Sequence, residues 1–169
     1  MENQEIKFMP TFTEKWGDLI KEASNYDAIV HGCNCFNSMG AGIAAGVAKV
    51  YPEADRVDKQ SIYGDINKLG TIEHVIIRDK NVIVVNAYTQ FTPGKDVSYA
   101  AIEMVLRKLN KDFEGRHIAL PMIGCGIAGG YWEIVYNMMK RILKDVSVTI
   151  IYWEGEYDKF NGVFPSVIQ

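Results

Sequence analysis

The stretch RHIALPMIGCGIAGGYWEIVYNMMKRILKDVSVTIIYWE, residues 116–154, decides the fold class. It begins as a short strand, passes through the glycine-rich turn 121–130, continues as a helix over 131–146 and ends as a strand over 147–154. An amphipathic helix over 97–113 comes before it, with apolar residues at helical spacing. Strands that alternate with helices in this way predict a parallel sheet covered by helices, an α/β fold.

The rest of the chain extends this pattern. Residues 70–90 predict two strands around a hairpin turn at Asp79–Asn81. Together these elements predict a three-layer α/β/α domain over residues 1–169, with a mixed, mostly parallel sheet and an antiparallel hairpin at one side. The remaining expected elements are strands at 5–8 and 27–32 and helices at 13–24 and 42–51, with Pro52 ending the second helix or opening the next turn.

Composition limits the classes of function. The chain has 169 residues, of which 48% are apolar and 23% charged, with a net charge of −3. No basic tract suggests a nucleic-acid partner, and the sequence has neither a signal-peptide pattern nor an apolar membrane span. Cys33, Cys35 and Cys125 make a poor disulfide framework. We therefore expect a cytoplasmic monomer whose partner is a small molecule, with no nucleic acid and no membrane.

Two glycine-rich turns, His31–Gly46 and Pro121–Gly130, each follow a strand and open a helix. In α/β sheets, ligands bind outside the carboxyl ends of the strands. Glycines let the backbone approach a ligand, and a helix start offers free N–H groups that suit phosphate. Each turn alone is also compatible with a purely structural role. Two such turns at one sheet edge favour a two-sided clamp for a pyrophosphate.

Several phosphate-handling mechanisms can be compared with these turns. A P-loop is excluded because neither turn carries its lysine. A cysteine phosphatase is excluded because Met39, Ala41 and Tyr131, not arginine, lie six residues after the three cysteines. A dinucleotide-binding G-x-G-x-x-G at 124–129 stays open as a weak match. A zinc site built from His31, Cys33, Cys35 and Cys125 also stays open, although the spacing is unusual, and we expect no metal and no cofactor.

The pair of motifs HGCNC with MGAGIA, and LPMIGCGIAGGYWE downstream, resembles the macrodomain family of ADP-ribose-binding modules over about residues 27–153. Within that family it is most similar to the ADP-ribose-1''-phosphate phosphatase branch. The resemblance implies that the first turn surrounds the distal ribose and its phosphate, and that the second surrounds the diphosphate. The ligand-binding residues implied are Gly32, Cys33, Asn34, Met39, Gly40, Ala41, Gly42, Ile43, Ala44, Ile123, Gly124, Cys125, Gly126, Ile127, Ala128 and Gly129.

The resemblance also implies catalytic candidates. His31 is expected to be the acid–base group, Asn34 to fix the distal ribose, and Asp96 to reach the same ribose from its loop. Family members usually carry Asp or Asn after a glycine in the first loop, where it contacts the adenine amino group. Here we take the corresponding stretch to be Met9–Phe12, with Thr11 in place of the acid.

Two hydrolase branches of the family use devices that this sequence lacks. One places an aspartate just after its glycine run, where this chain has Ala44. The other uses a lysine near the end of the hairpin and an aspartate in the second turn, where this chain has Thr89 or Gln90 and Ala128. The function expected is therefore 1''-phosphate hydrolysis. The alternatives are binding or sequestration of ADP-ribose or a related nucleotide without turnover, and ADP-ribosyl hydrolysis.

Overall fold

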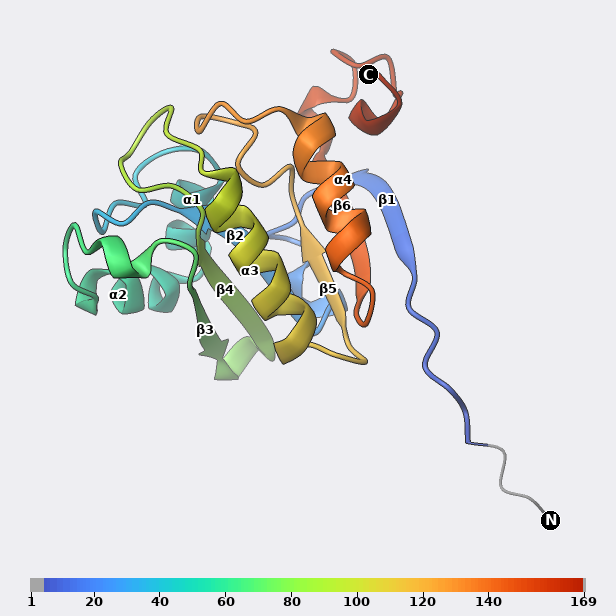
Figure 1. Ribbon diagram of the computed structural model, residues 1–169, viewed down its shortest axis with the longest axis horizontal. Helices are drawn as coiled ribbons and strands as arrows, with labels where there is room; N and C mark the ends of the chain where they lie inside the picture. Colours follow the sequence, from blue (N-terminus) through green and yellow to red (C-terminus); the bar gives the residue numbers. More distant parts are fainter. Residues whose placement is uncertain (1–4, 169) are drawn as a thin grey trace.

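The computed structural model describes residues 5–168, which form a mixed sheet between two pairs of helices. The strand order is β1-β6-β5-β2-β4-β3, and the layers are visible in Figure 1. The strands are β1 (Phe12–Gly17), β2 (Ala28–Cys33), β3 (Ile72–Ile77), β4 (Val82–Tyr88), β5 (His117–Leu120) and β6 (Ser147–Trp153). The helices are α1 (Gly42–Val50), α2 (Pro52–Gln60), α3 (Tyr99–Asp112) and α4 (Trp132–Ile142).

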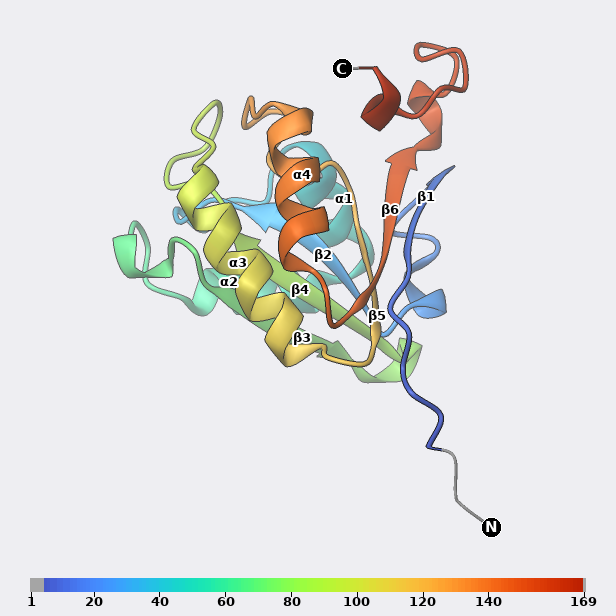
Figure 2. The same cartoon turned by 45° about the vertical axis from the view of Figure 1, so that its right-hand side comes forward.

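Each face of the sheet has its own apolar core. Helices α3 and α4 pack side by side on one face, as Figure 2 shows, and α1 and α2 cover the other. The first core centres on Ile102, Leu106 and Val135 against the sheet, and the second on Val47 and Ala54. Strands β2, β4 and β5 are buried on both faces, which explains why their sequences are largely apolar and do not alternate with polar residues. The predicted three-layer α/β/α fold is confirmed.

Strand direction determines where a site can form. β1 pairs with β6, β6 with β5, β5 with β2 and β2 with β4, all in parallel, and β3 alone is antiparallel, to β4, within the described chain. The carboxyl ends of five strands therefore lie at one edge of the sheet. The two glycine-rich turns leave from β2 and β5, which are neighbours. The predicted hairpin is also present, with Asn81 at φ 51° in its turn.

The region before residue 27 differs from the prediction. Residues 5–8 form no strand, and the expected helix at 13–24 is instead strand β1 followed by turns. The spacing of Trp16, Leu19, Ile20 and Ala23 fits a helix face, but Trp16 ends up in an edge strand. There it packs against the rings of Tyr152, at 5.5 Å, and of Phe160, at 5.9 Å. Tertiary packing has overridden the local periodicity.

The C-terminal segment, whose sequence carries no clear pattern, folds back on β1. Trp16 Nε1 donates a hydrogen bond to the carbonyl of Gly162 at 3.3 Å, and Ser166 donates to the carboxylate of Glu14. Tyr152 OH donates to the same carboxylate at 2.6 Å. In Figure 1 this segment (red) stands beside β6 and α4 at the edge from which the glycine-rich turns also emerge. The segment thus extends the domain at the β1–β6 side.

Two buried polar side chains lie side by side at the centre of the sheet. His31 and Asn86 are completely buried and adjacent across β2 and β4. Asn86 Nδ2 donates to the carbonyl of Ala54 at 3.0 Å, so Asn86 Oδ1 is the acceptor for His31 Nε2–H at 2.7 Å. Burial lowers the pKa of His31 to about 4, from an ordinary 6.5, against the smaller opposing effect of the Asn86 hydrogen bond. The fold therefore holds His31 neutral.

This burial predicts a pH-dependent stability. Because the folded pKa lies below the unfolded one, the unfolded chain takes up the proton first as the pH falls. The contribution of His31 is complete above pH 6.5 and is lost between pH 6.5 and about 4, amounting to about 3 kcal/mol. Urea unfolding of wild type and of His31→Gln at pH 7, 5.5 and 4.5 measures this. The wild type is expected to lose more stability on acidification than the variant, and equal losses contradict the assignment.

Candidate functional site

A cleft of about 820 Å³ runs along the carboxyl edge of the sheet. One end lies at β1 and β6, and the other at β2 and β4, three strand spacings or roughly 14 Å away. Its lining is mostly apolar and main chain. The residues that line it are Asp18, Leu19, Ile20, Gly32, Cys33, Asn34, Ser38, Gly40–Ala44, Gly46, Thr89, Gln90, Pro93, Gly94, Pro121–Ala128, Ile151–Trp153, Glu156, Lys159 and Phe160.

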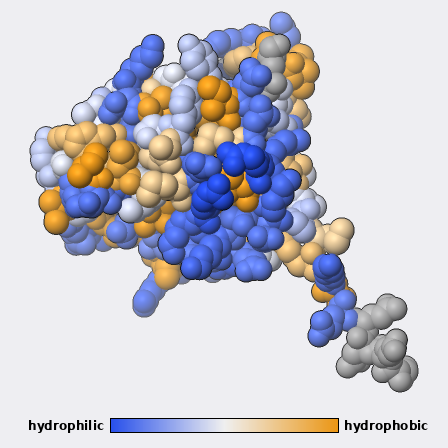
Figure 3. All heavy atoms as spheres, in the orientation of Figure 1, coloured by the Kyte–Doolittle hydropathy of each residue, from blue (hydrophilic) through white to orange (hydrophobic). Residues whose placement is uncertain are grey.

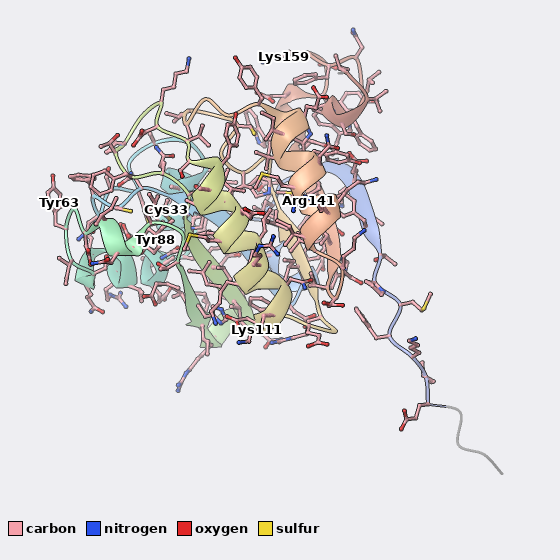
Figure 4. The ribbon with its side chains drawn as sticks, in the orientation of Figure 1. Cys33, Tyr63, Tyr88, Lys111, Arg141 and Lys159 are labelled. Atoms are coloured by element: carbon pink, nitrogen blue, oxygen red, sulfur yellow. The ribbon has the colours of Figure 1, made fainter. Side chains whose placement is uncertain are left out.

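The loop after β2 is held in shape by its own amides. Asn34 Oδ1 accepts from the N–H of Phe36 at 2.8 Å, and Asn34 Nδ2 donates to the carbonyl of Ser38 at 2.9 Å. Asn37, at φ 55°, accepts at Oδ1 from the buried ammonium of Lys68 at 2.8 Å. These bonds fix the turn that delivers the chain to α1. Figure 4 shows Cys33 and Tyr88, the last residues of β2 and β4, beneath this loop.

Helix α1 begins at the cleft without a side-chain cap. Its N-cap residue, Ala41, is extended and its methyl group accepts no hydrogen bond. The N–H groups of the first turn, Gly42–Ala44, have no intrahelical acceptor. Because they line the cleft together with the positive end of the helix dipole, they suit a negatively charged group.

The second loop offers a matching set of donors. Gly130 N–H donates to the carbonyl of Gly124 at 2.8 Å, and Gly129 N–H donates to that of Gly126 at 3.1 Å, which closes the loop on itself. Within residues 5–168, no acceptor is found for the N–H groups of Gly126, Ile127 and Ala128.

The two loops face each other across the cleft. A Cβ atom built on Gly42 would lie 3.1 Å from Ile127 Cδ1, so the first turn of α1 touches the second loop. The φ of Gly42 is +57°, a conformation that favours glycine. The predicted approach of the two turns is confirmed, and residues with main-chain donors from both turns line the same cleft.

The end of the cleft at β1 and β6 carries the features that the sequence analysis missed. Asp18 follows Gly17 directly, and its Oδ1 accepts from the N–H groups of Ile20 at 3.0 Å and Lys21 at 3.2 Å. Trp153, which is 62% exposed, and Phe160 add aromatic surface. Lys159 also lines the cleft and belongs to the C-terminal segment, as Figure 4 shows.

Asp18 corrects the expected alignment at the N-terminus. The sequence analysis expected Thr11, in the stretch Met9–Phe12, to stand in place of the family's acid. The structure instead puts a Gly-Asp pair, Gly17 and Asp18, at the end of β1, and Asp18 is an acid that follows a glycine. Thr11 instead precedes β1, where its N–H donates to Ser147 Oγ at 3.1 Å. The error came from the mistaken helix at 13–24: once residues 12–17 form a strand, Asp18 stands at a strand end like the other cleft residues.

Most of the predicted binding residues line the cleft. Met39 and Gly129 do not: Met39 packs into the core beneath α1, and Gly129 lies under the aliphatic stem of Lys95. The predicted residues that the structure brings together there are Gly32, Cys33, Asn34, Gly40, Ala41, Gly42, Ile43, Ala44, Ile123, Gly124, Cys125, Gly126, Ile127 and Ala128.

The two predicted titrating groups do not fit their expected roles. His31 is 0% exposed and hydrogen-bonded to Asn86, so it neither reaches the cleft nor carries a positive charge at neutral pH. Asp96 accepts from Thr92 N–H and Thr92 Oγ1, both at 2.8 Å, and these bonds lower its pKa. It braces the 92–96 turn and is absent from the cleft lining among the described residues.

The cysteines offer no activated thiolate. Burial raises the pKa of Cys33 well above its ordinary value and that of Cys125 to about 12. In the part of the chain that the structure describes, no three His, Cys, Asp or Glu side chains cluster closely enough to hold a metal, which disagrees with the zinc alternative. Nor is any helix there long and apolar enough to cross a bilayer.

Comparison with known proteins adds the family. No family model matches the sequence. The chain is 33% identical over 145 residues to an uncharacterized 17.5 kDa protein of Enterobacteria phage T4, covering 82% of this chain and 94% of that protein. It is 30% identical over 116 residues to an ADP-ribose 1''-phosphate phosphatase of Candida albicans, covering 62% of this chain and 74% of the relative.

The fold is also similar to that of solved structures. The macrodomain of Mycobacterium tuberculosis DarG superposes with a TM-score of 0.70 at 22% identity, covering 85% of this chain and 98% of that one. Thermosipho africanus DarTG, solved in complex with ADP-ribose, gives a TM-score of 0.73 at 21% identity over 98% of this chain and 46% of that one. With this fold and a relative that is 30% identical over 74% of that relative's length, the chain belongs to the macrodomain family.

Proposed function

We propose that this protein binds ADP-ribose, or a derivative altered at the distal ribose, in the cleft. The observation that carries the proposal is the pair of facing loops, whose unpaired N–H groups lie on both sides of one channel. A diphosphate has oxygens on both sides and suits such a clamp. The T. africanus and Trypanosoma brucei structures, both solved with ADP-ribose, support the choice of ligand.

The two ends of the cleft differ in chemistry and give the ligand a direction. At the β1–β6 end, the Asp18 carboxylate and the Trp153 and Phe160 rings suit a flat base with an exocyclic amino group. At the β2–β4 end, Asn34, Ser38 and the Thr89–Gln90 pair suit a sugar with hydroxyl groups. Adenine at the first end and the distal ribose at the second leave the diphosphate between the loops.

Gly126 provides a direct test of the clamp. A Cβ atom at this residue would meet nothing within 4 Å, and its φ is not positive, so Gly126→Val adds bulk to the channel without strain in the fold. We expect calorimetry to show binding of both ADP-ribose and ADP at least a hundredfold weaker, with the melting temperature nearly unchanged. Lys111→Val, at the opposite end of the domain in Figure 4, is the matched control and should bind normally. Unimpaired binding by Gly126→Val contradicts the placement of the diphosphate.

The second candidate function is hydrolysis of ADP-ribose 1''-phosphate, favoured by the similarity to the C. albicans relative, an ADP-ribose 1''-phosphate phosphatase. The β2–β4 end has main-chain donors that would stabilise developing charge. Its one titratable lining side chain within residues 5–168 is Cys33, whose pKa is raised by burial. Hydrolysis would therefore proceed with water oriented by main chain alone, and turnover would be slow.

This candidate predicts a distinctive set of kinetics. Above the second pKa of the substrate phosphate, about 6, release of inorganic phosphate from ADP-ribose 1''-phosphate should vary little between pH 7.5 and 8.5, and it should survive His31→Gln and Asp96→Asn. Gly40→Val should abolish it, because a Cβ atom there meets only Ser38 Oγ, at 3.9 Å, and otherwise fills the cleft. If His31→Gln stays folded and loses phosphate release, this account is contradicted and His31 is the acid–base group after all. Tight binding of ADP-ribose with no phosphate release assigns the protein to binding alone.

A further inference from the structure

Two buried side-chain oxygens have no hydrogen-bond partner among residues 5–168: Asp58 Oδ2 and Thr89 Oγ1. They differ in their surroundings. The other oxygen of Asp58 accepts from Tyr88 OH at 2.8 Å and lies 3.8 Å from the Lys68 ammonium, in a cluster away from the cleft. Thr89 has only one polar side-chain atom, so its side chain is entirely unsatisfied, and the residue lines the cleft.

The main chain of Thr89 is held firmly at the strand ends. Its N–H donates to the carbonyl of Cys33 at 3.2 Å, and its carbonyl accepts from the N–H of Ser98 at 3.0 Å. The residue is 1% exposed. It therefore lies beside the start of the first loop, at the β2–β4 end of the cleft, and has no freedom to turn toward solvent.

Gly32 keeps the space above the hydroxyl open. A Cβ atom at Gly32 would lie 2.8 Å from Thr89 Oγ1 and 3.4 Å from Ile123 Cγ1. Gly32, Thr89 and Ile123 all line the cleft, so a side chain at residue 32 would lie against the hydroxyl, whereas glycine leaves bare main chain there. Thr89 Oγ1 therefore already faces the space that a side chain at residue 32 would fill.

The neighbouring side-chain amides of Gln90 and Asn34 already make hydrogen bonds within the loops. Both N–H groups of Gln90 Nε2 are used, by the carbonyls of Thr92 and Gly94, each at 2.8 Å. Asn34 is bonded through both ends of its amide to its own loop. At this end of the cleft, within the described chain, Thr89 is thus the buried polar side chain that makes no hydrogen bond at all.

A buried hydroxyl without a partner lowers stability, and a bound ligand that supplies the partner removes that cost. We propose that the Thr89 hydroxyl is a specificity-determining contact for the part of the ligand beyond the diphosphate, the distal ribose or its 1'' substituent. This inference rests on the proposed function. According to this inference, the cleft binds ADP-ribose-type ligands more tightly than ADP, and one side chain, Thr89, causes the difference in affinity.

The test compares Thr89→Val, which keeps the shape but removes the hydroxyl, with Thr89→Ser, which keeps the hydroxyl. Thr89→Val should melt about 2–6 °C higher than wild type, because the unsatisfied group is gone. Its affinity for ADP-ribose should fall about tenfold by calorimetry, while its affinity for ADP stays within about twofold of wild type. Thr89→Ser should keep the wild-type ratio of the two affinities.

The alternative outcomes separate this inference from the function beneath it. If wild type binds neither ADP-ribose nor ADP, the proposed function fails and the inference falls with it. If wild type binds ADP-ribose and Thr89→Val binds it equally well, the proposed function stands and the inference is overturned. An equal loss of affinity for both ligands also overturns it, because it shows a general change in the cleft and no contact to the distal ribose.

Discussion

The parallel pairing of β1, β6, β5, β2 and β4 is the constraint on which the rest of the structure depends. Parallel strands end at the same edge, so the connections that leave these five strands are brought together there. The central strand β2 places one glycine-rich loop beside the other, from β5, and the contact between Gly42 and Ile127 follows from that adjacency. A cleft walled by main-chain donors results, with little need for charged side chains.

This use of main chain accounts for the composition of the site. The charged residues that line the cleft are Asp18, Glu156 and Lys159, all at the β1–β6 end, within the residues described. The start of α1, Gly42–Ala44, and the facing segment Gly126–Ala128 contribute only glycine, alanine and isoleucine to the lining. In Figure 3 hydrophilic and apolar residues are mixed on the face that bears α3, with an apolar patch on the flank at the side of α1 and α2. The chemistry of the cleft therefore depends mainly on how its loops position main-chain N–H groups.

The sequence predicted most of the fold, because buried parallel strands and amphipathic helices leave strong local patterns. The helices that became α3 and α4 and the hairpin around Asn81 are examples. It failed at β1, where the half-buried Trp16 packs against aromatic residues more than a hundred positions away, contacts that no local window contains. That single error hid Asp18. A stronger signal was available in the Gly17–Asp18 pair, since an acid that follows a glycine is what the family resemblance places in the first loop.

The site was predictable as a set of loops and not as a set of side-chain roles. Residue type and spacing identified both glycine-rich turns, but burial decided that His31 is a core histidine and that Asp96 braces its own turn. The C-terminal segment could not be assigned to the cleft, because Lys159 and Phe160 reach it only through the packing of that segment on β1. The unsatisfied hydroxyl of Thr89 is visible only once the surroundings of Gly32 are known.

The central claim is that two sets of main-chain N–H groups clamp a diphosphate. Amide proton and nitrogen shifts, recorded by NMR during a titration with ADP-ribose, test it most directly because they report on the donors themselves. The account predicts the largest changes at Gly42–Ala44 and Gly126–Ala128 together, with Asn81 and Arg116 at the opposite sheet edge unaffected. Saturable binding that leaves either loop unperturbed, or that shifts the opposite edge, would contradict it.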